Sequence, residues 1–192
     1  YILPSRAAAF NNKHSDVSFE ILIKDSALVI EDVGSGRVYL GVVGVELPST
    51  KTEFAPCGGD ELVLAAAPDW PINDTIDGTE LLKHAFLARE RGSGTGRNVE
   101  LFLGQIGVAA TDLKIRAILG SSTAIKEAVK SGLGVAVISK TAIRDELADG
   151  ALKIIEVRGL SMKRSFYVVT PKRRSLPHHY QVFREFLLSN LG

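Results

Sequence analysis

The sequence has one cysteine, Cys57, among its 192 residues. A single thiol cannot form an internal disulfide, and it cannot complete a zinc site by itself. Because disulfides are rare in reducing compartments, we expect a cytoplasmic protein. No apolar run approaches the roughly 18 residues that a transmembrane helix needs, so we expect no contact with a membrane.

An excess of charge of one sign is also missing. There are 23 Lys and Arg residues against 22 Asp and Glu residues, a formal net charge of +1. Domains that bind nucleic acid are usually strongly basic, because phosphate contacts supply much of their affinity. We therefore interpret the basic stretch 172–174 as solvated surface. With 45% hydrophobic and 23% charged residues, the composition is typical of a folded globular protein.

A recognisable catalytic set is missing as well. None of the four histidines is spaced with Cys, Asp or Glu as metal ligands are, and none belongs to a nucleophile motif. Asp16, Asp25 and Asp60 are expected in turns, where capping is the default role. We therefore predict no metal site, no cofactor and no enzymatic activity.

Short apolar runs alternate with segments of helical period along most of the chain. The runs predict strands at 17–23, 38–43, 61–66, 84–89, 114–119, 134–139, 152–157 and 165–170. The periodic segments predict helices at 4–13, 26–33, 97–106, 123–130, 141–148 and 179–188. This alternation indicates an α/β fold with mostly parallel sheets.

Two interruptions of this rhythm predict two Rossmann-like lobes. Pro68 and Pro71 follow a buried strand, and the polar stretch 158–164 precedes another. We expect residues 1–66 plus 165–192 to form lobe I and residues 67–164 to form lobe II. Two crossover strands would then join the lobes, an arrangement suited to closure around a small molecule.

The glycine-rich stretch 89–97, Arg-Glu-Arg-Gly-Ser-Gly-Thr-Gly-Arg, lies between a predicted strand and a predicted helix. Glycines let backbone N–H groups approach a ligand closely, hydroxyls add donors, and a helix N-terminus attracts anions. The stretch contains neither a P-loop nor a nucleophile elbow. It predicts an anion cradle, and the alternative is a turn whose Ser93 or Thr95 merely caps the helix.

A second turn of the same kind follows the next predicted strand. Gly120, Ser121, Ser122 and Thr123 precede the helix expected at 123–130. Simple capping by Ser122 is the alternative interpretation of this turn. Two such turns in one lobe favour a binding crevice, and a carboxylate or another oxyanion is its natural ligand.

Five stretches, in this order, resemble the effector-binding domain of LysR-type transcriptional regulators, and the resemblance covers essentially the whole chain. They are Leu3-Pro4 with Ala8-Ala9-Phe10, Val17-Ser18-Phe19-Glu20, Arg89-Glu90 with Gly92-Ser93-Gly94-Thr95, residues 128–136, and Phe183-Arg184-Glu185-Phe186-Leu187. The sequence departs from the family pattern at Tyr39, where an acidic residue is common, and at Trp70-Pro71, where His-Pro is common.

The resemblance implies a periplasmic-binding-protein-like fold of type 2, with a small-molecule inducer in the cleft between the lobes. Carried over by position, the ligand-binding residues are Arg89, Ser93, Gly94, Thr95, Ser121, Ser122 and Thr123. It implies a homodimer, and a tetramer in the full-length form, with helix 4–13 and strand 17–23 against helix 123–130 of a partner. The family's first strand and its winged helix-turn-helix would precede Tyr1, so DNA would be bound through that part alone.

Two other functions remain open from the residues. A secreted solute-binding receptor has the same architecture, and a signal peptide before Tyr1 would favour it over a regulator. An enzyme acting on a carboxylate would need an acid or base at the crevice. Glu90 is the acid/base candidate there, and a Glu90 side chain turned away from the crevice would remove it.

Overall fold

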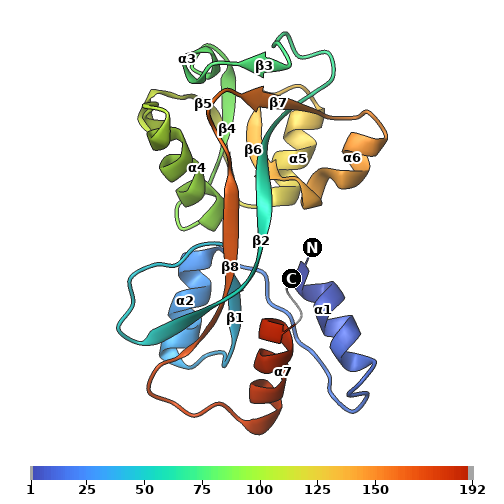
Figure 1. Ribbon diagram of the computed structural model, residues 1–192, viewed down its shortest axis with the longest axis vertical. Coiled ribbons are helices and arrows are strands. Elements are labelled where there is room, and N and C mark those ends of the chain that lie inside the picture. Colours follow the sequence, from blue (N-terminus) through green and yellow to red (C-terminus); the bar gives the residue numbers. More distant parts are fainter. Residues whose placement is uncertain (1, 190–192) are drawn as a thin grey trace. The chain divides into compact units, whose positions relative to one another are not determined.

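The computed structural model describes residues 2–189, and its contacts divide the chain into two units (Figure 1). Unit 1 comprises Tyr1–Gly59 and Ser165–Gly192, and unit 2 comprises Asp60–Arg164. The elements of unit 1 are α1 (Ile2–Asn11), α2 (Ser26–Ser35), β1 (Gly41–Val43) and α7 (His178–Ser189). Unit 2 contains β3 (Thr75–Ile76), α3 (Gly78–Leu81), β4 (Ala85–Arg89), α4 (Gly94–Gln105), η1 (Ala110–Asp112), β5 (Lys114–Leu119), α5 (Ser122–Lys130), β6 (Ala136–Ser139), η2 (Thr141–Ile143), α6 (Arg144–Ala148) and β7 (Lys153–Val157).

The chain passes between the units inside two long strands, β2 (Thr52–Ala66) and β8 (Lys163–Pro171). The first passage lies between Gly59 and Asp60, whereas the sequence pattern placed it after Ala66. The prolines that follow Ala66 mark the end of β2 and not the change of unit. Asp60 therefore lies within a strand, and its expected place in a turn is wrong.

The strands of unit 2 pair in both directions. Strand β2 is antiparallel to β6 and to β7, whereas β3 is parallel to β7 and β4 is parallel to β5. The expectation of mostly parallel sheets is wrong, because hydrophobic periodicity predicts strands but carries no information on their direction. Gly134 brings β4 close to β6, since a Cβ atom there would lie 2.5 Å from the carbonyl oxygen of Ala85.

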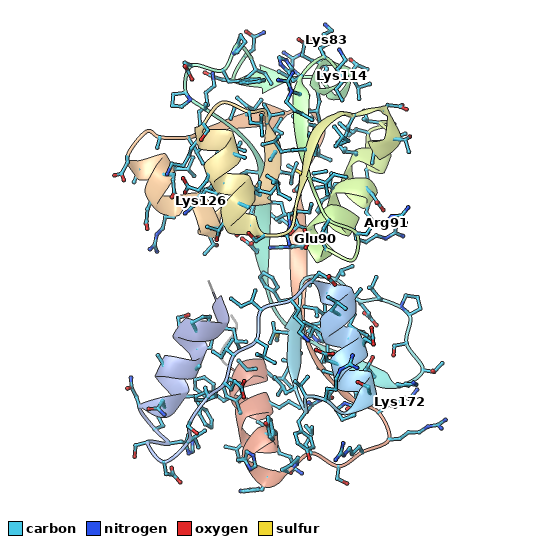
Figure 2. All side chains as sticks on the ribbon, turned by 180° about the vertical axis from the view of Figure 1, so that it is seen from behind. Lys83, Glu90, Arg91, Lys114, Lys126 and Lys172 are labelled. Carbon is cyan, nitrogen blue, oxygen red and sulfur yellow. The ribbon has the colours of Figure 1, made fainter. Side chains whose placement is uncertain are left out.

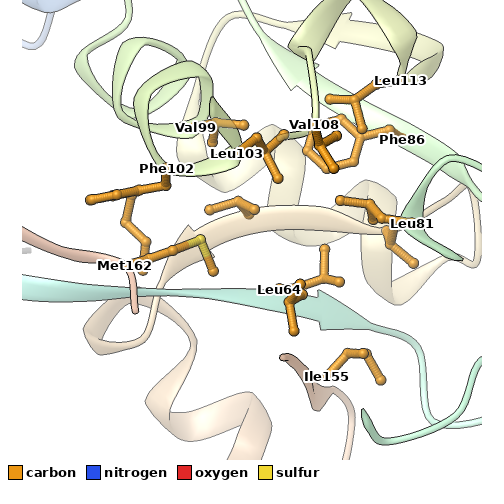
Figure 3. Packing of buried hydrophobic residues seen from close by; sticks show 14 of the residues in the cluster. Leu64, Leu81, Phe86, Val99, Phe102, Leu103, Val108, Leu113, Ile155 and Met162 are labelled. Atoms are coloured by element: carbon orange, nitrogen blue, oxygen red, sulfur yellow. The ribbon is translucent and has the colours of Figure 1, made fainter. Parts of the chain in front are cut away.

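The core of unit 2 covers both faces of β2. Leu62 and Leu64 point into a cluster that includes Val99, Phe102 and Leu103 of α4 (Figure 3). Val63 and Ala65, which alternate with them, point into a second cluster that contains residues of α5 and α6. Alternate side chains of a strand leave on opposite faces, so the continuous apolar run 62–67 indicates a strand covered by helices on both sides.

Unit 1 has the same arrangement around β8. Val168 packs with Phe10 of α1 and Phe183 of α7, and Val169 packs with Ile30 and Val33 of α2. The segment 17–23, expected as a strand, has no strand structure. An extended segment becomes a strand only when a neighbouring strand pairs with its N–H and C=O groups, and none of the described strands pairs with residues 17–23.

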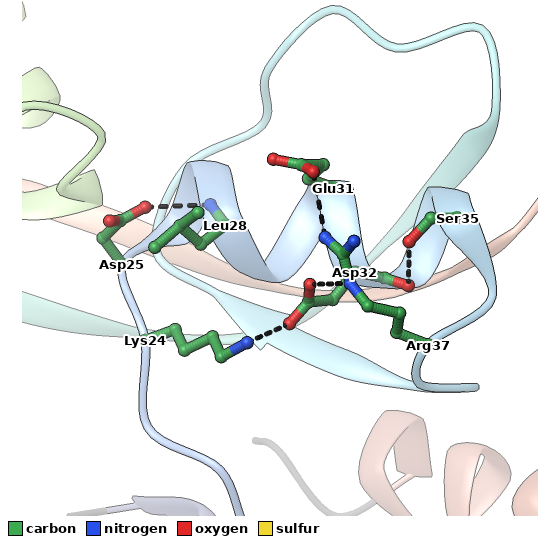
Figure 4. A network of polar contacts seen from close by, with 7 residues as sticks. All are labelled: Lys24, Asp25, Leu28, Glu31, Asp32, Ser35 and Arg37. Carbon is green, nitrogen blue, oxygen red and sulfur yellow. Dashed lines mark hydrogen bonds and ion pairs between the residues drawn. The ribbon is translucent and has the colours of Figure 1, made fainter.

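Unit 1 also contains a buried carboxylate. Asp32 accepts hydrogen bonds from Lys24 Nζ and Arg37 Nε, each 2.6 Å long (Figure 4). These bonds, that from Lys24 first, lower the pKa of Asp32 below its ordinary value and outweigh the opposing effect of burial. Asp25 caps α2, as expected, by accepting a bond of 2.9 Å from the Leu28 N–H. These contacts link Lys24, just before α2, through Asp32 to Arg37, just after the end of α2.

Among the described residues, no helix is long and apolar enough to cross a membrane.

Candidate functional site

Both glycine- and hydroxyl-rich turns lie at one edge of the β4–β5 pair. The two strands are parallel, so their carboxyl ends lie at the same edge, where ligands of such sheets bind. Helix α4 begins at Gly94 after β4, and α5 begins at Ser122 after β5. Figure 2 shows Glu90 at this end of unit 2 and Lys114, the first residue of β5, at the opposite end.

Two of the predicted hydroxyls cap helices. Ser93 Oγ accepts a bond of 3.4 Å from the Gly96 N–H, and Ser121 Oγ accepts one of 3.1 Å from the Ala124 N–H. The capping interpretation is confirmed for Ser93, whereas in the second turn Ser121 and not Ser122 is the cap. Helix α4 starts at Gly94, three residues before the helix expected from the periodicity, because the glycines of the first turn carry no apolar signal.

Arg89, the last residue of β4, joins the two turns. Its Nη1 donates to Ser122 Oγ over 3.0 Å, and its Nε and Nη2 each donate to the Glu90 carboxylate over 2.7 Å. The Arg89 side chain is 13% exposed and that of Glu90 is 25% exposed. A largely buried guanidinium therefore lies at the start of α5, where an oxyanion would also meet the helix N-terminus.

A second arginine reaches the first turn. Arg164 Nη1 donates to Thr95 Oγ1 over 3.0 Å, and Nη2 donates to Asp60 Oδ2 over 3.1 Å. The Arg164 and Asp60 side chains are 10% and 2% exposed. Burial lowers the pKa of Arg164, Asp60 counteracts that effect, and the charge of Arg89 adds to it. Arg89 and Thr95, the residue to which Arg164 donates, line the same cavity, so the two guanidinium groups belong to one cluster.

Sequence reasoning missed Arg164 and Asp60. Their separation of 104 residues gives no local motif. Asp60 resembles a capping residue, and Arg164 ends a polar stretch that predicts surface. The sequence does contain one signal. Asp60 and Arg164 each lie next to a predicted apolar strand, and charged residues are rarely buried unless they are paired.

The remaining predicted residues differ in their surroundings. Gly94 is buried, and its carbonyl oxygen accepts a bond of 2.7 Å from Asn98 Nδ2, while Thr123 is exposed. A cavity of about 150 Å³ lies beside Arg89, Thr95 and Gly96. Most of its other lining residues are apolar, namely Phe86, Leu87, Ala88, Val99, Ala110, Leu113, Ile115 and Val137, with the carboxylate of Glu100.

The ionisable groups provide little for catalysis. Hydrogen bonds from Arg89 hold the pKa of Glu90 below its ordinary value, so this carboxylate is a poor general acid near neutral pH. Cys57 is buried in unit 1, and burial raises its pKa to about 11, which leaves almost no thiolate. In the part of the chain that the structure describes, no three His, Cys, Asp or Glu residues are placed to hold a metal ion.

Comparison with known proteins gives the family. Residues 1–192 match the model of the LysR substrate binding domain. The chain is 32% identical over 192 residues to the RuBisCO operon transcriptional regulator of Acidithiobacillus ferrooxidans, an alignment that covers 98% of this chain and 61% of that protein. This chain thus spans about three fifths of the length of that curated relative.

Solved structures give the same fold. The regulatory domain of Synechocystis PCC6803 CcmR, solved in complex with 2-PG, superposes with a TM-score of 0.86 at 26% identity, covering 98% of this chain and 90% of that chain. A putative phosphate ABC transporter substrate-binding protein from Clostridium perfringens, with bound phosphate, gives 0.81 at 20% identity and covers 97% and 88%. The fold is therefore periplasmic-binding-protein-like, as predicted. The chain belongs to the LysR substrate-binding domain family.

Proposed function

We propose that this chain is the effector-sensing domain of a LysR-type transcriptional regulator and binds a small anion at the turns that precede α4 and α5. The observation that carries the proposal is the bond from Arg89 Nη1 to Ser122 Oγ, which joins a buried guanidinium to a helix N-terminus. Arg164 brings a second guanidinium to Thr95 at the start of α4. Two guanidinium groups and two helix N-termini together suit a carboxylate, phosphate or sulfate-like group.

The ligand of a related protein supports a small-molecule effector. The CcmR regulatory domain, 26% identical to this chain, has 2-PG as its ligand. No separate cofactor is proposed, because the effector supplies the signal. The curated relative is named as a transcriptional regulator, which favours a regulator over a secreted receptor. By the same kinship we propose that the longer protein binds DNA outside this chain and acts in the cytoplasm.

The binding test is a thermal-shift and calorimetry series with sulfate, inorganic phosphate, acetate and 2-PG. A ligand at 100 times its Kd stabilises a protein by about 2.7 kcal/mol, so at least one dianion is expected to raise Tm by several degrees. Ser122→Ala and Thr95→Ala each remove one hydroxyl and are expected to weaken binding roughly threefold to tenfold. Ser131→Ala, at the other end of α5, is the matched control. An unchanged Tm of the parent chain across the series would contradict the proposal.

We further propose that the chain forms a homodimer, and that the full-length protein forms a tetramer. Exposed apolar side chains support a partner of the same kind. Ile23 in unit 1 is 91% exposed, and Ile118 in β5 of unit 2 is 66% exposed. Solvent-exposed isoleucines become favourable when a second copy covers them.

The test of the dimer is the molar mass from light scattering after size exclusion. The parent chain is expected to elute as a dimer, and Ile118→Asp, which would bury a charge in the interface, as a monomer. Lys114→Gln, at the start of the same strand, changes the net charge by the same amount and is the control. A parent chain that is monomeric throughout the accessible concentration range would contradict the dimer.

A further inference from the structure

The binding face of Arg89 is already occupied by a group of the same chemistry as the proposed ligand. Nε and Nη2 form the side of the guanidinium that grips a carboxylate with two parallel hydrogen bonds. Both donate to Glu90, to Oε2 and Oε1, over 2.7 Å each. The remaining group, Nη1, donates to Ser122 Oγ. An oxyanion that needs the two-bond grip of Arg89 therefore meets a carboxylate of the chain itself.

The two arginines of the cluster and their two carboxylate partners together carry no net charge. Arg89 is paired with Glu90, and Arg164 is paired with Asp60. The cluster gains a net positive charge only when one carboxylate leaves. Asp60 is 2% exposed and also accepts from Thr141 Oγ1, whereas Glu90 is 25% exposed and has one side-chain partner in the described contacts. Glu90 is thus the carboxylate that can rotate toward water.

We infer that Glu90 is an internal competitor which occupies Arg89 in the unliganded protein and which the effector must displace. This inference rests on the proposed function, since it concerns the same site. A tethered carboxylate has a high effective concentration at its partner. A free monocarboxylate offers Arg89 the same two bonds and gains nothing over Glu90. A dianion brings a second charge that Arg164, Thr95 and the helix N-termini can bind, so it displaces Glu90 and a monoanion does not.

The competition sets the class of effector. A phosphate monoester and a dicarboxylate share the required chemistry, namely two negative charges on one small molecule. Glu90 then acts as a specificity-determining residue that excludes the abundant monocarboxylates. Its role differs from that of a positioning residue, which would hold Arg89 ready for the ligand and whose loss would weaken binding.

The variant Glu90→Gln separates the two roles. It keeps the size of the side chain and removes the charge that competes with the ligand. We expect sulfate to bind about tenfold more tightly than to the parent chain, since a charged hydrogen-bond acceptor no longer has to be displaced. We also expect acetate to bind measurably to Glu90→Gln and not to the parent chain. Glu127→Gln, which removes one exposed carboxylate paired with Lys130 on α5, is the control and is expected to leave both affinities unchanged.

A second readout uses the parent chain alone. Arg89 is the main reason that the pKa of Glu90 is low, and Arg164 and Asp60 are the other charged groups of the cluster. Saturation with sulfate, which does not titrate in this range, is expected to raise the pKa of the Glu90 carboxyl, measured by carbon-13 NMR, because the carboxyl leaves Arg89. This measurement needs no substitution, so it is independent of whether the variant folds.

The outcomes are distinct. Tighter binding of sulfate by Glu90→Gln, together with the rise of the Glu90 pKa, supports the inference. Equal or weaker binding by the variant, or a Glu90 pKa that stays low in sulfate-saturated protein, overturns the inference and leaves the proposed function intact. Failure of the parent and the variant to bind any anion overturns both.

Discussion

Replacing Asp60 by Asn is expected to lower the free energy of unfolding by about 3–5 kcal/mol, the usual effect of removing one partner of a buried ion pair. Asp60 and Arg164 are both nearly inaccessible to water. The substitution leaves the Arg164 guanidinium buried without its counter-charge, and burial already lowers the pKa of Arg164. The neutral amide cannot replace the attraction that the carboxylate provides.

Urea denaturation at pH 7 measures this loss, and the adjacent residue provides a control. Glu61 forms an ion pair of 2.7 Å with Lys140, but both side chains are about half exposed. Glu61→Gln is therefore expected to cost less than about 1 kcal/mol. Adding Arg164→Met to Asp60→Asn is expected to restore part of the stability, because no unpaired charge remains. Losses below about 1 kcal/mol for both Asp60→Asn and Glu61→Gln would show that the buried Asp60–Arg164 pair stabilises the chain no more than an exposed pair does.

Replacing Arg89 by Gln is expected to weaken binding of sulfate or phosphate by about 100-fold, or about 3 kcal/mol, as for loss of a buried charged hydrogen-bond partner. Arg89 is the group that contacts the start of α5 and lies at the end of β4. The glutamine side chain carries no charge and cannot grip an oxyanion with two parallel bonds. Arg89→Lys keeps the charge without the planar fork, so its affinity is expected to lie between those of the parent and Arg89→Gln.

Calorimetric titration measures the affinities, and Arg97→Gln is the matched control. Arg97 lies in the first turn of α4 and is paired with Glu100 over 2.7 Å, yet both side chains are half exposed. Its removal changes the net charge equally and is expected to reduce affinity less than about threefold, because exposed charges are screened by salt. Equal effects at positions 89 and 97 would show that the anion is attracted by the general charge of this surface.

The apolar pattern predicts most of the fold because burial leaves a periodic trace. The strands expected at 61–66, 84–89 and 114–119 correspond to β2, β4 and β5 of the structure. The apolar pattern does not predict which segments pair as strands or in which direction they pair. The segment 17–23 alternates like a strand but has no strand structure. The antiparallel pairing of β2 with β6 depends on the path that residues 67–135 take within unit 2.

The residues of the candidate site also differ in whether a local sequence pattern points to them. The sequence points to Ser93, Thr95 and Ser122 because glycine and hydroxyl residues between a strand and a helix are a local signal. Arg164 and Asp60 were not found, because a pair that joins the two crossing strands leaves no spacing to recognise. The roles of the individual hydroxyls depend on the three-dimensional structure. Ser121 and Ser122 are adjacent and chemically identical, yet one caps α5 and the other accepts from Arg89.

The state of Cys57 makes this chain well suited to site-specific labelling. The thiol is buried, and its pKa of about 11 leaves it protonated at pH 7. Maleimide reagents react with thiolates, so Cys57 remains unmodified while an introduced, exposed cysteine reacts. A fluorophore on Thr123→Cys, at the exposed start of α5, therefore reports on the turn that meets Arg89 without any change to the natural cysteine.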